Sequence, residues 1–180
     1  MPMDTPWLLC SYRLPREPSR LRLAVWRRLR RLGALMVHGG LWVLPHDHKT
    51  REDFEWLSQE IEERGGEVLI WEARSLSTTQ DTSLAAGFRA ESEQRYSELA
   101  AAAEQLVRVT RRRTLKPASR EQVMQRLRLL ERGLRQERRR DHLRAPGRVA
   151  AESTLRNSLE QVRAAAAAPR DDRRRRAVGH

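Results

Sequence analysis

The sequence predicts a mixed α+β fold with a compact first part and a basic, helical second part. Between Trp7 and Trp71, short apolar runs and two amphipathic segments follow the order strand, helix, strand, strand, helix, strand. That order is typical of a split βαβ, or ferredoxin-like, sandwich, in which two helices cover one face of an antiparallel sheet. Residues 1–75 contain 12 Lys or Arg against 11 Asp or Glu, whereas residues 105–180 contain 22 against 8. The positive charge therefore belongs to the second part.

The first predicted strand and helix lie within the first thirty-odd residues. Trp7–Tyr12 is an apolar and aromatic run, typical of a buried strand. Ser19 is a favourable N-cap for a helix over residues 20–32. The apolar stripe of that helix consists of Leu21, Val25, Leu29 and Leu32. Gly33 follows, where a helix commonly ends in a left-handed residue.

Two brief strands follow, joined by a glycine pair. Gly39-Gly40 separates Ala34–His38 from Leu41–Leu44. Two glycines between short apolar runs predict a two-residue hairpin turn, because both central residues of such a turn have positive φ.

A second helix and a last strand complete the predicted sandwich. Thr50 and, three residues later, Asp53 have the spacing of a capping box, so we expect the helix to begin at Thr50. Val68–Trp71 is the last predicted strand. Helices on one side leave the other face of a four-stranded sheet uncovered, so we expect a homodimer formed through the sheet.

Three more helices are predicted in the second part. Apolar residues recur at spacings of three, four and seven over residues 81–110, 120–142 and 149–167. Pro117 and Pro146 separate these segments. Each helix has one apolar stripe, and three such helices can pack as an up-down-up bundle.

The predicted domains are a ferredoxin-like domain over residues 1–75, a helical module over 76–168 and a disordered basic tail over 169–180. The single cysteine cannot form an internal disulfide, which agrees with a reducing cytoplasm. No apolar run approaches the twenty residues of a membrane span, and the N-terminus lacks the pattern of an export signal. We therefore expect a cytoplasmic protein with no membrane contact.

Arginine clusters are the candidate contacts to a polyanion. The arginine fork can donate two hydrogen bonds to one phosphate. The alternative interpretation is a solvated helix face in an arginine-rich sequence. The candidate nucleic-acid-binding residues are Arg20, Arg27, Arg28, Arg31, Arg111, Arg112, Arg113, Arg138, Arg139 and Arg140. We expect the charges of Arg138–Arg140 to be removable with little loss of fold, because they follow the last strong apolar position of their helix.

Other chemically suggestive residues fit structural roles better. The tryptophans, apart from Trp26, fall in or beside predicted sheet and helix positions and are expected to pack in the core or a dimer interface. Cys10 is expected to be a small buried side chain in the first strand. His46 and His48 lack further ligands nearby, so no metal site is expected. No glycine-rich phosphate loop or nucleophile elbow is present in the sequence, and no cofactor is expected.

Several segments in order and spacing resemble the N-terminal domain of the chromate-resistance regulator ChrB. The resemblance covers about residues 7–165. The segments that carry it are residues 7–19 (WLLCSYRLPREPS), 25–34 (VWRRLRRLGA), 41–45 (LWVLP), 50–57 (TREDFEWL), 88–99 (FRAESEQRYSEL) and 138–148 (RRRDHLRAPGR). His142 and Leu143 stand where that family tends to have aromatic residues. The first part is also similar, at the level of fold, to PaaX-type repressors and small CRISPR-adaptation nucleases.

The resemblance implies a transcriptional regulator of chromate-efflux genes, with DNA as partner and chromate or another oxyanion as effector. Related small nucleases carry an Asp at the end of the first strand, but here the chain reads Ser11-Tyr12-Arg13. We therefore expect a non-enzymatic regulator rather than a metal-dependent nuclease. A protein-interaction module that binds an acidic partner is the alternative.

Overall fold

The computed structural model describes residues 6–16, 19–111 and 117–167. The chain divides into two compact units. The first comprises the residues up to Ser92 together with Gln136–Ala145, and the second comprises Glu93–Arg135 together with the residues from Pro146 onward. The division falls inside two helices and differs from the predicted boundary between residues 75 and 76. The predicted tail, residues 169–180, lies outside the described residues.

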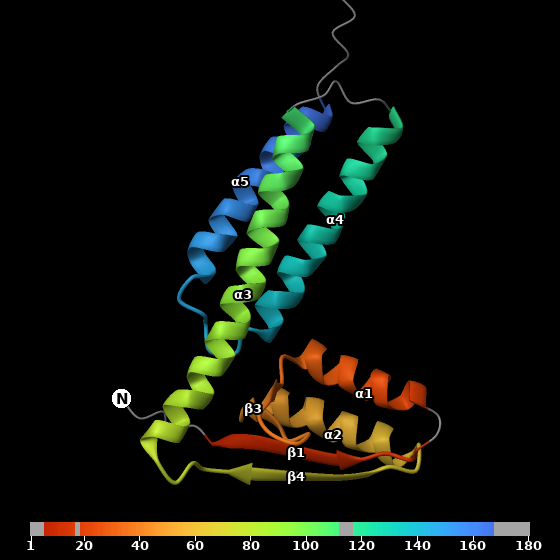
Figure 1. The fold of residues 1–180 in the computed structure, drawn as a ribbon, viewed down its shortest axis with the longest axis vertical. Helices are drawn as coiled ribbons and strands as arrows, with labels where there is room; N and C mark the ends of the chain where they lie inside the picture. Colours follow the sequence, from red (N-terminus) through yellow and green to blue (C-terminus); the bar gives the residue numbers. More distant parts are fainter. Residues whose placement is uncertain (1–5, 17–18, 112–116, 168–180) are drawn as a thin grey trace, which may run out of the picture. The chain divides into compact units, whose positions relative to one another are not determined.

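The first unit is built on a four-stranded antiparallel sheet. Its elements are, in chain order, β1 (Trp7–Arg13), α1 (Ser19–Leu32), β2 (Leu35–Met36), β3 (Trp42–Pro45), α2 (His48–Glu62) and β4 (Glu67–Ala73). The strands lie in the order β2-β3-β1-β4, and α1 and α2 lie side by side over one face of the sheet (Figure 1). The predicted mixed α+β class is confirmed.

The glycine pair makes the predicted hairpin between β2 and β3. Gly39 and Gly40 have φ of 52° and 92°, which only glycine adopts without strain. The turn is closed by the Leu41 N–H, which donates to the His38 carbonyl at 2.8 Å. Pairing continues with Leu35 opposite Val43 and Met36 opposite Trp42. The strand β2 is thus shorter than the predicted Ala34–His38.

The main core lies between the sheet and the two helices. The buried apolar helix residues are Leu21, Val25 and Leu29 from the predicted stripe of α1, and Phe54, Leu57 and Ile61 from α2. They pack in one cluster with buried sheet residues that include Leu8, Cys10, Trp42 and Leu44. Full burial of a large apolar side chain contributes roughly 1.5–3 kcal/mol, so this cluster is the main source of stability in the unit.

The opposite face of the sheet is partly covered by the chain itself. Trp7 stacks on Phe88 of α3 (Thr78–Arg111), with 5.7 Å between ring centroids. The indole N–H of Trp7 also donates to Asp81 Oδ1 at 2.8 Å. The first turns of α3 therefore contact this face at Trp7, and the homodimer through the sheet stays a prediction.

Part of that face stays open to solvent. Leu69 and Trp71 of β4 are 59% and 45% exposed. Trp56 of α2 is 60% exposed, whereas Trp7 and Trp42 are buried. The expectation of core packing is therefore confirmed for Trp7 and Trp42. Trp56 and Trp71 lie outside the core of this chain, and their packing in a dimer interface stays a prediction.

The helix α2 begins at His48, two residues earlier than predicted. Asp47 is the N-cap, since its Oδ1 accepts the Thr50 N–H at 2.7 Å. The Thr50 hydroxyl in turn accepts the Asp47 N–H at 2.9 Å, which completes a capping box. Thr50 is thus the N3 residue of the box and not its N-cap.

The second unit is helical. It contains most of α3 and of α4 (Pro117–Arg140) and the whole of α5 (Arg148–Ala167), which run alongside one another (Figure 1). Its core cluster contains Ala103, Leu106, Val107, Val123, Leu127, Leu155, Leu159 and Val162. Within the described ranges, every helix is too short or too polar to cross a membrane.

Candidate nucleic-acid interface

The predicted arginines of α1 form one exposed row. Arg20, Arg27 and Arg31 are exposed and lie seven and four residues apart, a spacing that places them on one side of a helix. Arg28 lies beside this row and is half-buried. No Asp or Glu occurs within α1, so its arginines have no carboxylate on their own helix.

One α1 arginine that was not predicted as a contact has an internal role. Arg30 Nη1 lies 2.9 Å from both carboxylate oxygens of Glu91, on α3. Both side chains belong to the first unit and are partly shielded from water. This ion pair joins α1 to α3 and removes Arg30 from the set available to a partner.

The three arginines that end α4 have different surroundings. Arg138 and Arg139 are exposed. The side chain of Arg140 is only 10% exposed; Nη1 lies 3.4 Å from Glu137 Oε2 and Nη2 lies 4.0 Å from Glu91 Oε2. Successive helical residues point about 100° apart, so the third arginine turns inward while its neighbours face solvent. The expectation that Arg140 belongs to a surface cluster, removable with little loss of fold, is therefore corrected.

The other predicted cluster is only partly described. Arg111, at the end of α3, is exposed, and its Nη2 donates to Gln161 Oε1 of α5 at 2.7 Å. Arg112 and Arg113 lie outside the described residues.

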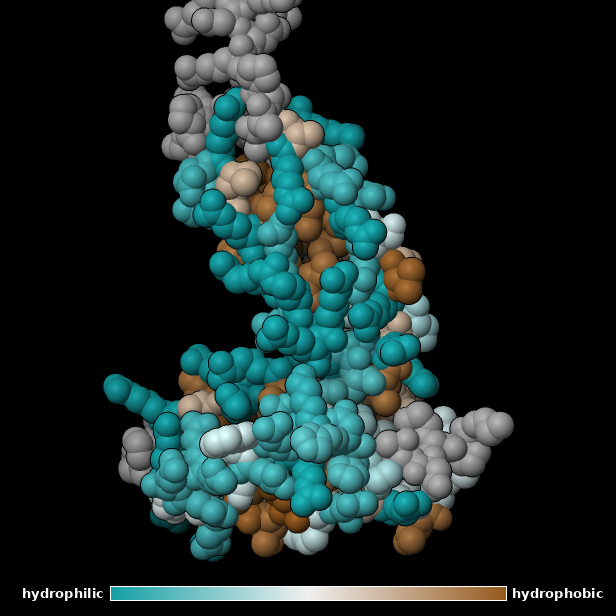
Figure 2. Space-filling view, turned by 180° about the vertical axis from the view of Figure 1, so that it is seen from behind, coloured by the Kyte–Doolittle hydropathy of each residue, from teal (hydrophilic) through white to brown (hydrophobic). Residues whose placement is uncertain are grey.

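A row of arginines on α4 was missed by sequence reasoning. Arg128, Arg132 and Arg135 are exposed, and their spacing of four and three residues places them on one helix face. We call them the outer-face arginines, since they lie opposite the buried Leu127 and the partly buried Leu130. Hydrophilic side chains cover most of the helical surface seen in Figure 2.

The outer-face arginines make no ion pair with any described residue. The only carboxylate three or four residues from them is Glu131, and it pairs with Arg163 of α5 instead. Arg128 and Arg132 are four residues apart and repel each other, as do Arg132 and Arg135. The sequence signal that could have found them is this spacing combined with the lack of neighbouring acids.

The helices α2 and α3 pair several of their exposed arginines with carboxylates of the same helix. On α2, Arg51 Nε lies 2.8 Å from Glu55 and Arg64 Nη2 lies 3.3 Å from Glu60. On α3, Arg108 Nη2 lies 3.6 Å from Glu104. Each pair is separated by four residues, the ordinary arrangement of a solvated helix. The outer face of α4 departs from that arrangement.

The remaining candidate groups have structural surroundings. Cys10 is buried, and desolvation raises the pKa of its thiol to about 12, so the reactive thiolate is not formed near neutral pH. His46 Nδ1 lies 3.8 Å from Glu72, and Asp47 caps α2. In the part of the chain that the structure describes, no three His, Cys, Asp or Glu side chains converge as a metal site would require.

These features define a mixed α+β protein followed by an arginine-rich helical part. The family model described as "Protein ChrB, N-terminal" matches residues 22–168, and the chain belongs to this family. Membership associates the chain with the regulation of chromate resistance. Among curated proteins, no match was found.

Proposed function

We propose that the chain is a non-enzymatic transcriptional regulator of chromate resistance that binds DNA mainly through arginine–phosphate contacts. In this proposal the four strands with α1 and α2 form a ferredoxin-like sandwich, and α3, α4 and α5 follow it in the chain. The observation that carries the proposal is the row of outer-face arginines, which have no carboxylate partner among the described residues.

Electrostatics favours a polyanion at this face. Like charges three or four residues apart destabilise a free helix by a few tenths of a kcal/mol per pair. Phosphates bound along the row would neutralise these charges and so remove the repulsion. Arg128 and Arg135 are seven residues apart, a rise of roughly 10 Å along the helix axis. About three phosphate-to-phosphate steps along one DNA strand span the same axial distance.

The exposed row on α1 is a second candidate surface in the first unit. Arg20, Arg27 and Arg31 also lie on one side of their helix, and α1 contains no Asp or Glu. Arg139, also exposed in the first unit, remains a candidate. Arg140 is left out of the proposed contacts because Glu91 and Glu137 already surround its guanidinium.

The test compares two triple variants with equal charge change. In the first, Arg128, Arg132 and Arg135 become Gln. In the matched control, the paired arginines Arg51, Arg64 and Arg108 become Gln. Each protein is titrated against its own promoter DNA over a range of salt concentrations. Neutralising three phosphate contacts lowers the slope of log K against log salt by up to about 3.

We expect the first variant to lose slope and affinity and the control to stay close to the parent. Equal losses in both variants would mean that only net charge matters. If the parent shows no binding even at low salt, the alternative of an acidic protein partner replaces the DNA proposal. Release of cleaved DNA fragments with magnesium or manganese would overturn the non-enzymatic part.

A further inference from the structure

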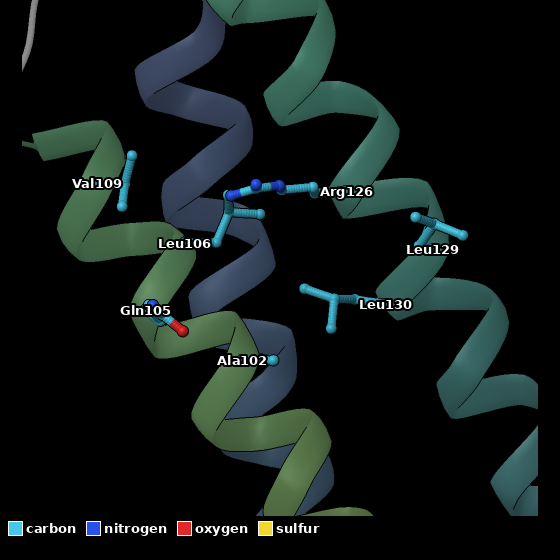
Figure 3. Close-up of a pocket in the computed structure, with 7 residues that line it drawn as sticks. All are labelled: Ala102, Gln105, Leu106, Val109, Arg126, Leu129 and Leu130. Carbon is cyan, nitrogen blue, oxygen red and sulfur yellow. The ribbon is translucent and has the colours of Figure 1, made fainter.

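An apolar groove lies within the second unit, between α3 and α4. Its volume is about 420 Å³. Figure 3 shows the lining side chains, which are Ala102, Gln105, Leu106 and Val109 from α3 and Arg126, Leu129 and Leu130 from α4. Val109 and Leu129 are 42% and 58% exposed. Large apolar side chains at this exposure on neighbouring helices are typical of a binding surface.

The groove exists because the three helices of this unit leave the surface between α3 and α4 uncovered. A Cβ on Gly133 would lie 2.8 Å from Leu99 Cδ2, so α3 and α4 are in close contact there. Leu155 and Leu159 of α5 pack into the shared core with Leu127. Leu106 belongs to that core and Leu130 packs against it. The groove that they line with the more exposed Val109 and Leu129 lies in the position that a fourth helix takes in a four-helix bundle.

The charge at the groove limits what can bind there. Arg126 extends from α4 across the groove (Figure 3), and no described carboxylate pairs with it. Between Pro117 and Arg135, α4 carries five Arg and two Glu. A second copy would bring the same excess of positive charge, and residues 168–180 of this chain carry five Arg and two Asp. Charge complementarity therefore favours an acidic occupant.

We propose that this groove binds an amphipathic helix of a partner protein, with an acidic residue beside its apolar stripe. Apolar residues at helical spacing would cover Val109, Leu129 and Leu130, and the acidic residue would pair with Arg126. This is the helix-in-groove mode of recognition. It is separate from DNA binding, because Arg126 and Arg128 are two residues apart and so point about 160° from each other around the helix.

The probe is a fluorescent three-heptad peptide with a leucine stripe flanked by glutamates. A second peptide has lysine in place of each glutamate. Binding to the full chain is followed by fluorescence anisotropy, and the methyl NMR signals of Leu106, Val109 and Leu129 are followed in parallel. We expect the acidic peptide to bind at least tenfold more tightly and to shift these three methyl signals.

Variants locate the binding in the groove. Leu129→Gln should weaken the acidic peptide at least tenfold, and Arg126→Glu should reverse the preference between the two peptides. The exposed Arg156 of α5 lies outside the groove lining, so Arg156→Glu is the control for net charge and should leave the preference unchanged. Circular dichroism confirms that each variant is folded.

Three results would overturn the proposal. The first is equal binding of the two peptides by the parent. The second is an Arg156→Glu variant that matches Arg126→Glu, which would reduce the effect to net charge. The third is a dimer of the parent in sedimentation that Leu129→Gln converts to a monomer, which would assign the groove to a second copy of the chain.

Discussion

Arg135 and Arg140 lie on the same helix, five residues apart, yet their guanidinium groups have different surroundings. Arg135 is exposed in the second unit and pairs with no described carboxylate. Arg140 lies in the first unit with a side chain that is 10% exposed, between Glu137 and Glu91. The helix α1 repeats the contrast, since Arg30 binds Glu91 while Arg27 and Arg31 face solvent. An arginine is therefore structural or available according to the helix face it occupies, and the local charge total does not distinguish the two.

The largest expected effect tests the buried side of this comparison. Arg140→Ala leaves the buried Glu137 without its arginine, and loss of one partner from a buried pair costs about 3–5 kcal/mol. Arg139→Ala, one residue earlier and exposed, should change the free energy of unfolding by no more than about 0.5 kcal/mol. Urea denaturation of both variants measures the difference. Equal stabilities would show that the ion pairs around Arg140 contribute nothing.

Gly33 sharpens the same comparison, because it lies against the backbone of Arg140. A Cβ at Gly33 would lie 2.7 Å from the Arg140 carbonyl oxygen, and φ is +77°. Gly39→Ala is the control, since φ is +52° and nothing lies within 4 Å of its Cβ. Left-handed strain alone costs about 1–2 kcal/mol. We expect Gly39→Ala to lose that amount in thermal unfolding and Gly33→Ala to lose clearly more. Similar losses of stability in the two variants would mean that the end of α4 can shift away from residue 33 without cost.

His142, two residues after Arg140, should make the first unit sensitive to pH. Its Nε2 lies 2.8 Å from the Leu32 carbonyl, so the neutral ring donates from Nε2. Burial lowers the pKa of His142 below the usual 6.5. The unfolded chain therefore takes up a proton more readily, and stability falls as pH drops below about 6.5. His142→Phe keeps an aromatic ring against Phe88 and should reduce the loss of melting temperature between pH 7.5 and pH 5.5. An unchanged loss would assign the pH dependence to other groups.

The smallest effect on stability is expected at the outer-face arginines. Replacing all three by Gln removes repulsion at helical spacing and no described ion pair, so the free energy of unfolding should change by no more than about 0.5 kcal/mol per site. At low salt, where repulsion is strongest, the change should be a small gain. Thermal melting at low and high salt measures it. A marked loss of stability would place these side chains among the structural arginines.

The sequence predicted the elements whose periodicity is strong. The stripe of α1, the glycine hairpin and the three long helices lie close to their predicted positions. The start of α2 was placed too late, because Asp47 and Thr50 are both good capping residues and only the geometry shows which of them comes first. Trp71 lies in β4 as predicted, but the alternation of apolar residues along a strand does not show which face of the sheet is exposed to solvent.

The candidate site was harder to predict, because the sequence does not show which arginines of a run face solvent and which face the rest of the protein. Arg138–Arg140 looks uniform, yet Arg140 turns toward Glu91, which is 49 residues away in the chain. Arg128, Arg132 and Arg135 are separated by Leu, Gly and Glu residues and so form no continuous run of arginines. They lack an ion pair with any described residue because Glu131, the carboxylate nearest to them in the sequence, pairs with Arg163 of α5 instead. Such competition between partners is decided only by the tertiary fold.

The division of the chain has a consequence for its synthesis. The first unit needs Gln136–Ala145, which the ribosome makes only after the long α3 and most of α4. Glu137, Arg140 and His142 are thus missing while the sheet is already complete. At roughly 5–20 residues per second, that interval lasts roughly 3 to 14 seconds. During it Phe88 and the Glu91 carboxylate lack their late partners, so the nascent first unit is the stage at which we expect aggregation or chaperone binding. A truncation at residue 92 would make that transient state permanent.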